Sequence, residues 1–331
     1  MPAATTIEEA AHRLADEVLF PAAGAVDGAD AVPAPHLDAL AAAGLYGLVG
    51  PPAAGGSGLG LATLSRVVEA LAGGDLATTF VWLQHQGLVR ALAAEDADQD
   101  LARAWLGPLC RGERRAGIAG GGLLPGTPRL RAEPVGDGWL LSGASPWVTG
   151  WGLVDVLHVP ARTADGEVLH LMVDGEEAAG LSVERQPLVA VHASRTVRAT
   201  FDRVVVPAER LVRREPYDPV AAAGGPALRS NGSLALGLAG RCCRLMGPSA
   251  LDDELAAARA ALDAAGEAQM AEARAAASAL AVRAAAALTV HQGSTAVVRA
   301  QPAERLTREA QFLLVFGSRP AIRTALLDRL R

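Results

Sequence analysis

The spacing of apolar residues changes twice along the 331-residue chain, and the resulting order of segments limits the folds that the chain can adopt. From residue 6 to about residue 115, apolar residues recur at helical spacing between Gly/Pro breaks. Between about residues 116 and 213, short segments rich in Val, Leu and Thr are separated by turn signals such as Gly136-Asp137-Gly138. Helical spacing then returns. Helices and strands that do not alternate predict segregated α and β parts, and argue against a doubly wound parallel sheet.

We therefore expect an α+β fold in three parts. The N-terminal helical domain spans residues 1–115, the middle β-barrel or β-sheet domain residues 116–213, and the C-terminal helical bundle residues 214–331. A Pro/Gly-rich passage at residues 216–226 follows the strands, and a long alanine-rich helical run covers residues 251–290.

Composition excludes several classes of protein. Half of the residues are apolar, 20% are charged and the net charge is −6, which excludes wholesale disorder and argues against a general nucleic-acid binder. The three cysteines do not form the spaced framework of a secreted disulfide scaffold. Acidic residues interrupt the N-terminus from the outset, and no charge-free apolar stretch of about 18 residues occurs. We therefore expect a cytoplasmic protein with no membrane span.

Several common catalytic motifs are absent. The sequence has neither a G-x-S-x-G nucleophile elbow nor a phosphate-binding loop ending in G-K-[ST]. The seven histidines never pair at ligand spacing with each other or with a cysteine, so we expect no metal site.

Three collinear segments carry a resemblance to a known family. They read GDGWLLSGASPWVTGWGLVDVLHVPART (136–163), ASRTVRATFDRVVVPAERLV (193–212) and PAERLTREAQFLLVFGSRPAIRTALLDRL (302–330). In this order they resemble the W-[IV]-T strand signature, the closing strand and the terminal E-G-T-x-x-I-Q-R helices of the acyl-CoA dehydrogenase family. The N-terminal LAAAGLYGLVGPPAAGGSGLG and FVWLQH segments resemble the helical domain of that family more loosely. The resemblance implies the same helical, β and helical order.

The resemblance also implies bound FAD. Trp147 offers a π face of the kind that can lie beside an isoalloxazine ring. Thr149 has a hydroxyl and a backbone N–H that could bond near the flavin N5/O4 edge, and Val148 lies between the two in the signature. Ser194 and Thr196 match the S-x-T that precedes the last strand in the family. The alternative is that these are ordinary strand residues with high β propensity.

The chain departs from the family at the catalytic base. Dehydrogenation removes the α proton of a thioester as the β hydride leaves to flavin N5, and a carboxylate must lie within reach of that proton. In many members this is the Glu of E-G-T, but the matching position here is Gly317 or Phe316, depending on the alignment. The other known place, the first helix of the C-terminal domain, has no Asp or Glu in residues 226–247. Glu309, about two helical turns before Gly317, is either a substitute base or a packing residue.

His85 is the other candidate for the substrate pocket. It is flanked by Gln84 and Gln86 in an otherwise apolar helix, where the resemblance brings the N-terminal domain near the active-site cleft. A buried polar group needs a partner, so the alternative is a histidine that is satisfied by helix packing.

We expect an FAD-dependent acyl-CoA dehydrogenase-like oxidoreductase that dehydrogenates an acyl thioester, on CoA or on a carrier protein, at Cα–Cβ in fatty acid metabolism. Three alternatives stay open: a base-less subunit of a heteromeric dehydrogenase, a flavin-dependent monooxygenase on the same fold, which needs no α-proton base, and a non-catalytic scaffold. The resemblance and the alanine-rich helices suggest a homo- or hetero-oligomer of two or four chains, with no nucleic-acid or membrane partner.

Overall fold

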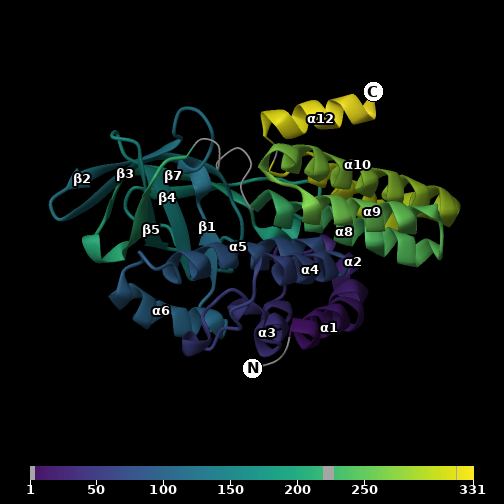
Figure 1. The fold of residues 1–331 in the computed structure, drawn as a ribbon, viewed down its shortest axis with the longest axis horizontal. Helices are drawn as coiled ribbons and strands as arrows, with labels where there is room; N and C mark the ends of the chain where they lie inside the picture. The colour runs from purple at the N-terminus through teal and green to yellow at the C-terminus, as the bar shows by residue number, and fades with distance from the viewer. Residues whose placement is uncertain (1–3, 219–226, 318) are drawn as a thin grey trace.

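Helices form both ends of the chain and strands form its middle (Figure 1). The computed structural model describes residues 4–218, 227–317 and 319–331. The N-terminal helices are α1 (Ala4–Leu14), α2 (Phe20–Asp27), α3 (Ala34–Ala42), α4 (Leu61–Ala72), α5 (Leu76–Leu92) and α6 (Gln99–Cys110). The C-terminal helices are α8 (Ala227–Met246), α9 (Ala250–Ala264), α10 (Glu267–Gln292), α11 (Pro302–Val315) and α12 (Pro320–Leu330). The predicted α+β order is confirmed.

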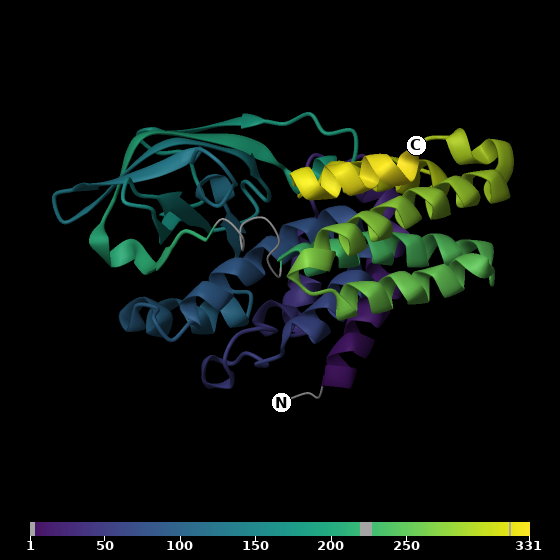
Figure 2. The same cartoon turned by 45° about the horizontal axis from the view of Figure 1, so that its top comes forward.

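The middle of the chain forms one eight-stranded mixed sheet. Its strands are β1 (Ala116–Ile118), β2 (Leu130–Val135), β3 (Gly138–Val148), β4 (Val156–Arg162), β5 (Glu167–Asp174), β6 (Leu181–Arg185), β7 (Val197–Val206) and β8 (Leu211–Pro216). The order across the sheet is β6-β7-β3-β2-β4-β5-β8, and β1 pairs in parallel with β4. Every residue of β4 is buried, as expected for a strand covered on both faces. Helices α5 and α6 lie below the sheet in Figure 2.

The two helical parts share one hydrophobic core, with α8 packed between α4 of the first part and α10 of the second. Gly237 permits this close contact, because a Cβ at that position would lie 2.2 Å from the carbonyl oxygen of Glu69. Where a glycine lies at a helix crossing, the two backbones can approach closely. Through this contact α8 joins the N-terminal helices to the C-terminal bundle.

The alanine-rich run at residues 251–290 is not a single helix. It consists of α9 and α10, which are separated at Ala265 and Gly266, and Gly266 is the N-cap of α10. Ser249 starts α9 with a capping box. Its hydroxyl accepts a hydrogen bond from a backbone N–H of the first turn, and the carboxylate of Asp252 accepts one from the backbone N–H of Ser249. Helix α10 with the turn after it (Glu267–Val297) is long and apolar enough to cross a membrane, but 61% of its most apolar window is buried inside the fold. Packing against neighbouring helices explains its composition.

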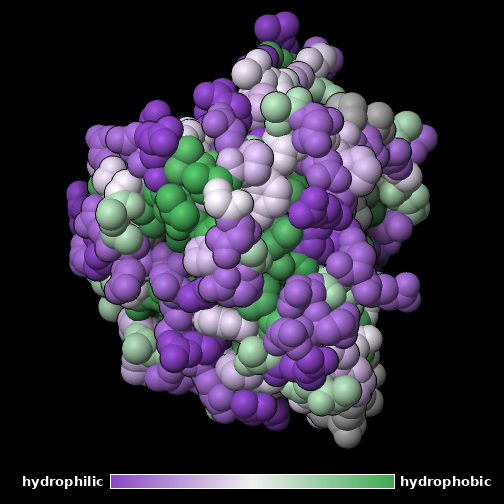
Figure 3. Space-filling model, turned by 90° about the vertical axis from the view of Figure 1, so that its left-hand side faces the viewer, coloured by the Kyte–Doolittle hydropathy of each residue, from purple (hydrophilic) through white to green (hydrophobic). Residues whose placement is uncertain are grey.

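The end of the molecule that the sheet forms is largely hydrophilic on the face shown in Figure 3, with separate apolar areas. Val135 and Val205 are among the exposed apolar residues of the strands. Most of the passage predicted between strands and helices, residues 219–226, lies outside the described residues.

Candidate functional site

The antiparallel pairing of β3 with β7 brings the two predicted flavin motifs together. Val148, at the end of β3, pairs with Val197, at the start of β7, so the residues after one strand lie beside those before the other. Thr149 Oγ1 lies 3.2 Å from Thr196 Oγ1, and Ser194 Oγ lies 2.8 Å from the same atom. We call these three residues the hydroxyl cluster. Each is at most 4% exposed.

The hydroxyl cluster has a hydrogen-bond donor to spare. Three hydroxyls carry three hydrogens, and the two contacts within the cluster use two of them. One hydroxyl of the row therefore keeps a hydrogen that can be donated to another acceptor; it is at Thr149 or Ser194 when the two bonds run in one direction, and at Thr196 when both ends donate to the middle. Buried donors generally find a partner, so this surplus marks the junction of β3 and β7 as a place to bind an acceptor atom.

The W-V-T signature divides between core and surface. Trp147 is 59% exposed, whereas Val148 and Thr149 are buried. The register of β3 with β7 shifts between Ser145 and Val148, so simple strand alternation does not govern these positions. The exposed indole of Trp147 offers a flat apolar surface two residues before the hydroxyl of Thr149.

The position expected for a catalytic carboxylate is surrounded by aromatic rings and one amide. Phe316 follows α11, and its ring centroid lies 4.7 Å from that of Phe80 and 5.5 Å from that of Phe312. Gly317 has φ +61°, and a Cβ there would lie 2.8 Å from Nδ2 of Asn231 on α8. The two places where family members carry a base thus face each other here. Asn231 was not predicted, because a carboxylate would indicate a base in residues 226–247 and an amide does not.

Glu309 lies inside the helical core and not in a cleft. It is 2% exposed, and its Oε1 accepts a hydrogen bond of 2.7 Å from Arg305 Nη1, one turn earlier on α11. Burial raises the pKa of Glu309 to about 7. This placement favours the packing alternative over a role as base.

His85 is a packing histidine and not a pocket-lining residue. It is 1% exposed, and its Nδ1 accepts a hydrogen bond of 3.1 Å from the backbone N–H of Ala116. Its ring meets the ring of Tyr46 edge to face at 4.7 Å. Burial lowers the pKa of His85 to about 3, so the imidazole stays neutral and joins α5 to β1.

Sequence reasoning also missed a buried polar chain across β4, β5 and β8. His158 Nε2 lies 2.9 Å from His170 Nδ1, and His170 Nε2 lies 3.0 Å from Oε1 of Glu215, which pairs with Arg213 at 2.8 Å. An ionised carboxylate only accepts, so His170 donates to Glu215 and accepts from His158. Burial lowers the pKa of both histidines. No group of three or more possible ligands forms a metal site within residues 4–218, 227–317 and 319–331.

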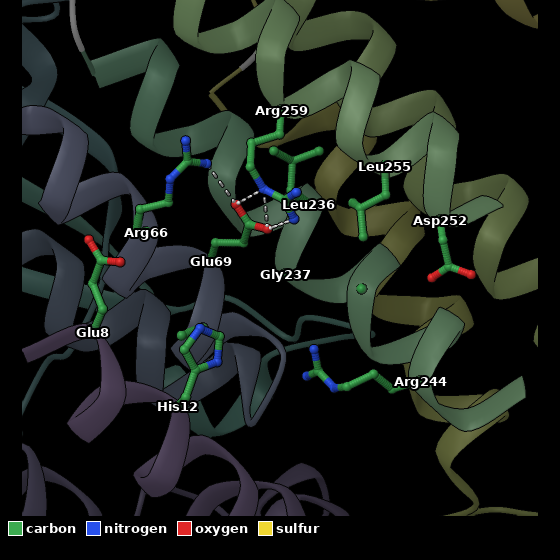
Figure 4. A pocket seen from close by; sticks show the side chains of 12 residues that line it. Glu8, His12, Arg66, Glu69, Leu236, Gly237, Arg244, Asp252, Leu255 and Arg259 are labelled. Carbon is green, nitrogen blue, oxygen red and sulfur yellow. Dashed lines mark hydrogen bonds and ion pairs between the residues drawn. The ribbon is translucent and has the colours of Figure 1, made fainter. Parts of the chain in front are cut away.

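A cavity of about 410 Å³ opens elsewhere, between α1, α4, α8 and α9 (Figure 4). Glu69 lies between Arg259, whose Nε is 3.0 Å from Oε1, and Arg66, whose Nη1 is 3.8 Å from Oε2. Glu8 and Asp252 balance most of the remaining positive charge of the lining. The cavity contains none of the predicted site residues.

Comparison with known proteins supports the resemblance seen in the sequence. The family description "Acyl-CoA dehydrogenase, N-terminal domain" matches residues 2–113. The chain is 28% identical over 208 residues to the 3-sulfinopropanoyl-CoA desulfinase of Paraburkholderia xenovorans, covering 59% of this chain and 52% of that protein. It is 26% identical over 219 residues to the benzylmalonyl-CoA dehydrogenase of Aromatoleum aromaticum, covering 64% and 58%. Residues 2–113 of the chain thus match the N-terminal domain of the acyl-CoA dehydrogenase family.

The fold of the chain is the acyl-CoA dehydrogenase fold. A glutaryl-CoA dehydrogenase from Mycobacterium smegmatis, solved in complex with FADH2, superimposes with a TM-score of 0.78 at 17% identity, over 99% of this chain and 94% of the other. The matched region is about half the length of the two curated relatives. The names of those two relatives show that acyl-CoA thioesters are handled in more than one way on this scaffold.

Proposed function

We propose that the chain is an FAD-dependent oxidoreductase that dehydrogenates an acyl-CoA thioester at Cα–Cβ. The observation that carries the proposal is the hydroxyl cluster beside the exposed Trp147, at the junction of β3 and β7. Together they supply a flat apolar surface and one surplus hydrogen-bond donor close together in the chain.

These residues suit a flavin. The indole of Trp147 would lie beside the ring system, and the surplus hydroxyl hydrogen of the cluster would bond to an acceptor at its edge. When bound, FAD supplies the acceptor for the hydride that leaves the substrate Cβ. The hydroxyls of the cluster are buried and bonded to one another, so they would be oriented before the ring binds.

Among the residues that the structure describes, the side chain nearest to an added Cβ at Gly317 is an amide and not a carboxylate, which favours a second candidate, a subunit that receives its base from a partner chain. The side chain that faces Gly317 is the amide of Asn231, which can orient a thioester by hydrogen bonding but cannot take up its α proton. In this version the chain holds flavin and thioester, and the proton leaves to a carboxylate of another subunit.

We further propose a cytoplasmic oligomer. Val290, Val297 and Val298 are 82%, 78% and 53% exposed at the C-terminal end of α10, which suits a contact with another subunit. The three cysteines are free and buried, as is usual in a reducing compartment. Light scattering of the purified chain measures its assembly.

An anaerobic spectral titration tests the function. The purified chain is reconstituted with FAD and mixed with a panel of saturated acyl-CoA thioesters that includes benzylmalonyl-CoA, and with 3-sulfinopropanoyl-CoA. Bleaching of the flavin with formation of an enoyl thioester is the expected result. If the chain binds flavin but no thioester bleaches it, the base-less subunit is favoured. If substrate is hydroxylated, and only when oxygen is admitted, the proposed reaction would be monooxygenation and not dehydrogenation. A chain that binds no FAD would contradict the proposal.

A further inference from the structure

Ser194 and Thr196 lie on a strained turn. The short helix His192–Ser194 is flanked by Val191 with φ +52° and Arg195 with φ +49°, both in the left-handed region. A β-branched residue is a clear outlier there. Such a backbone persists only where the surrounding structure holds it, and strained positions gather at sites where orientation matters.

The loop after β3 holds one side of this turn. The backbone N–H of Gly150 donates to the carbonyl of Ser194 at 2.8 Å, and Arg195 Nε donates to the carbonyl of Trp151 at 2.9 Å. These bonds tie residues 194 and 195 to the segment that carries Thr149, so one half of the hydroxyl cluster is fixed to the other.

The other side of the turn is held by the N-terminal helical part, through the loop between α2 and α3. The backbone N–H of Val32 donates to the carbonyl of Ala193 at 2.8 Å. Asp30 accepts from Arg195 Nη1 at 2.9 Å through one carboxylate oxygen and from Arg185 Nη1 at 2.5 Å through the other.

Arg185 extends this contact to the start of the turn. Its Nη2 donates to the backbone carbonyls of Asp30, at 2.6 Å, and of His192, at 3.3 Å. Asp30 therefore connects to both ends of the short helix, directly at Arg195 and through Arg185 at His192. Its side chain is 70% exposed, and an exposed ion pair adds little to global stability, so the effect of this contact is expected in local geometry.

We propose that Asp30 is a positioning residue for the flavin: it keeps the strained turn in place and thereby fixes the hydroxyls of Ser194 and Thr196. The inference rests on the proposed function, because the geometry it preserves matters only if that cluster binds the cofactor.

Asp30→Asn tests the proposal against a matched control, Asp38→Asn. Asp38 is also an exposed aspartate of the N-terminal part, with its side chain 65% exposed, and it pairs with Arg115 just before β1, away from the turn. Three quantities are compared: amide hydrogen exchange in the segment 190–197, the dissociation constant for FAD, and the absorption spectrum of the bound flavin. Arg185→Gln breaks the same connection and replaces Asp30→Asn if that variant does not fold.

We expect faster exchange in segment 190–197, about three- to tenfold weaker FAD binding and a shifted flavin spectrum for Asp30→Asn. Asp30→Glu, which keeps the charge, should retain more of the affinity, and Asp38→Asn should behave like wild type. If the wild-type chain binds FAD and Asp30→Asn matches it in exchange, affinity and spectrum, the positioning role is wrong while the proposed function stands. If the wild-type chain binds no FAD, both fall.

Discussion

Thr149 Oγ1 lies 3.2 Å from Thr196 Oγ1, although the two residues are 47 positions apart in the chain. The antiparallel register that pairs Val148 with Val197 explains this contact, since it places the end of β3 beside the start of β7. The contact unites two short motifs, each unremarkable alone, in one buried hydroxyl cluster with a donor to spare. The proposed flavin site depends on this junction of β3 and β7.

Thr149→Ala removes one hydroxyl of the cluster and is expected to weaken FAD binding by about tenfold, the value of one hydrogen bond of about 1.4 kcal/mol. Thr149→Ser keeps the hydroxyl and should stay close to wild type. Equilibrium titration with FAD, followed by flavin fluorescence, measures both. Equal affinity for all three proteins would show that Thr149 does not touch the flavin.

Asn231→Asp places a carboxylate opposite Gly317 without adding bulk. Because a positioned general base accelerates proton transfer, we expect bleaching by acyl-CoA to speed up on the order of a hundredfold. The gain should grow as pH rises and the new carboxyl loses its proton. Anaerobic stopped-flow absorbance gives the rate, and Asn231→Ala, which also loses the amide, is the control. A variant that keeps its flavin and is no faster than Asn231→Ala would place the reacting Cα elsewhere.

Glu309→Gln is expected to leave the rate of flavin bleaching within about twofold of wild type, because the carboxylate is buried against Arg305 and away from the hydroxyl cluster. The same substitution at Glu304, which pairs with Arg308 in a partly buried position on α11, is the matched control. Loss of bleaching in Glu309→Gln alone, with flavin still bound, would identify Glu309 as the base after all.

Acid should destabilise the chain through its buried histidines. Burial lowers the pKa of His158 and His170 in the folded state, whereas the unfolded chain takes up these protons near pH 6.5. The unfolded state then binds more protons, so the free energy of unfolding falls as pH drops below about 6.5, by at most about 1.4 kcal/mol per pH unit for each such histidine until its folded-state pKa is reached. His85, with its pKa lowered to about 3, adds to the same trend.

Chemical denaturation at a series of pH values measures this effect. His158→Gln combined with His170→Gln should flatten the dependence between pH 7 and pH 5, and His291→Gln, at an exposed histidine, should not. If the double variant kept the wild-type slope, the buried chain would not be the source of the acid sensitivity.

Local patterns predicted the order of helices and strands, and the resemblance to the family supplied the residues of the hydroxyl cluster. Thr149 and Ser194 each match a short motif of that family next to a strand, and strand pairing then brings the motifs together at their ends. The alanine-rich run was harder, since α9 and α10 have the same composition and only Gly266 marks the break.

Contacts that depend on packing between distant elements were not predictable. Asn231 meets Gly317 only because α8 packs beside the end of α11, and nothing near either residue indicates this. His158 and His170 bond diagonally across β4 and β5, where His158 is directly opposite Met172 and His170 is opposite Pro160. That contact requires the strand register, which spacing alone does not provide.

Calorimetric titration of the purified wild-type chain with FAD, with Thr149→Ala run beside it, decides whether the junction of β3 and β7 binds flavin. We expect saturable binding of one FAD per chain to the wild type and clearly weaker binding to the variant. A wild-type chain that takes up no FAD, or a variant that binds it equally well, would contradict the assignment of the junction of β3 and β7 as the flavin site.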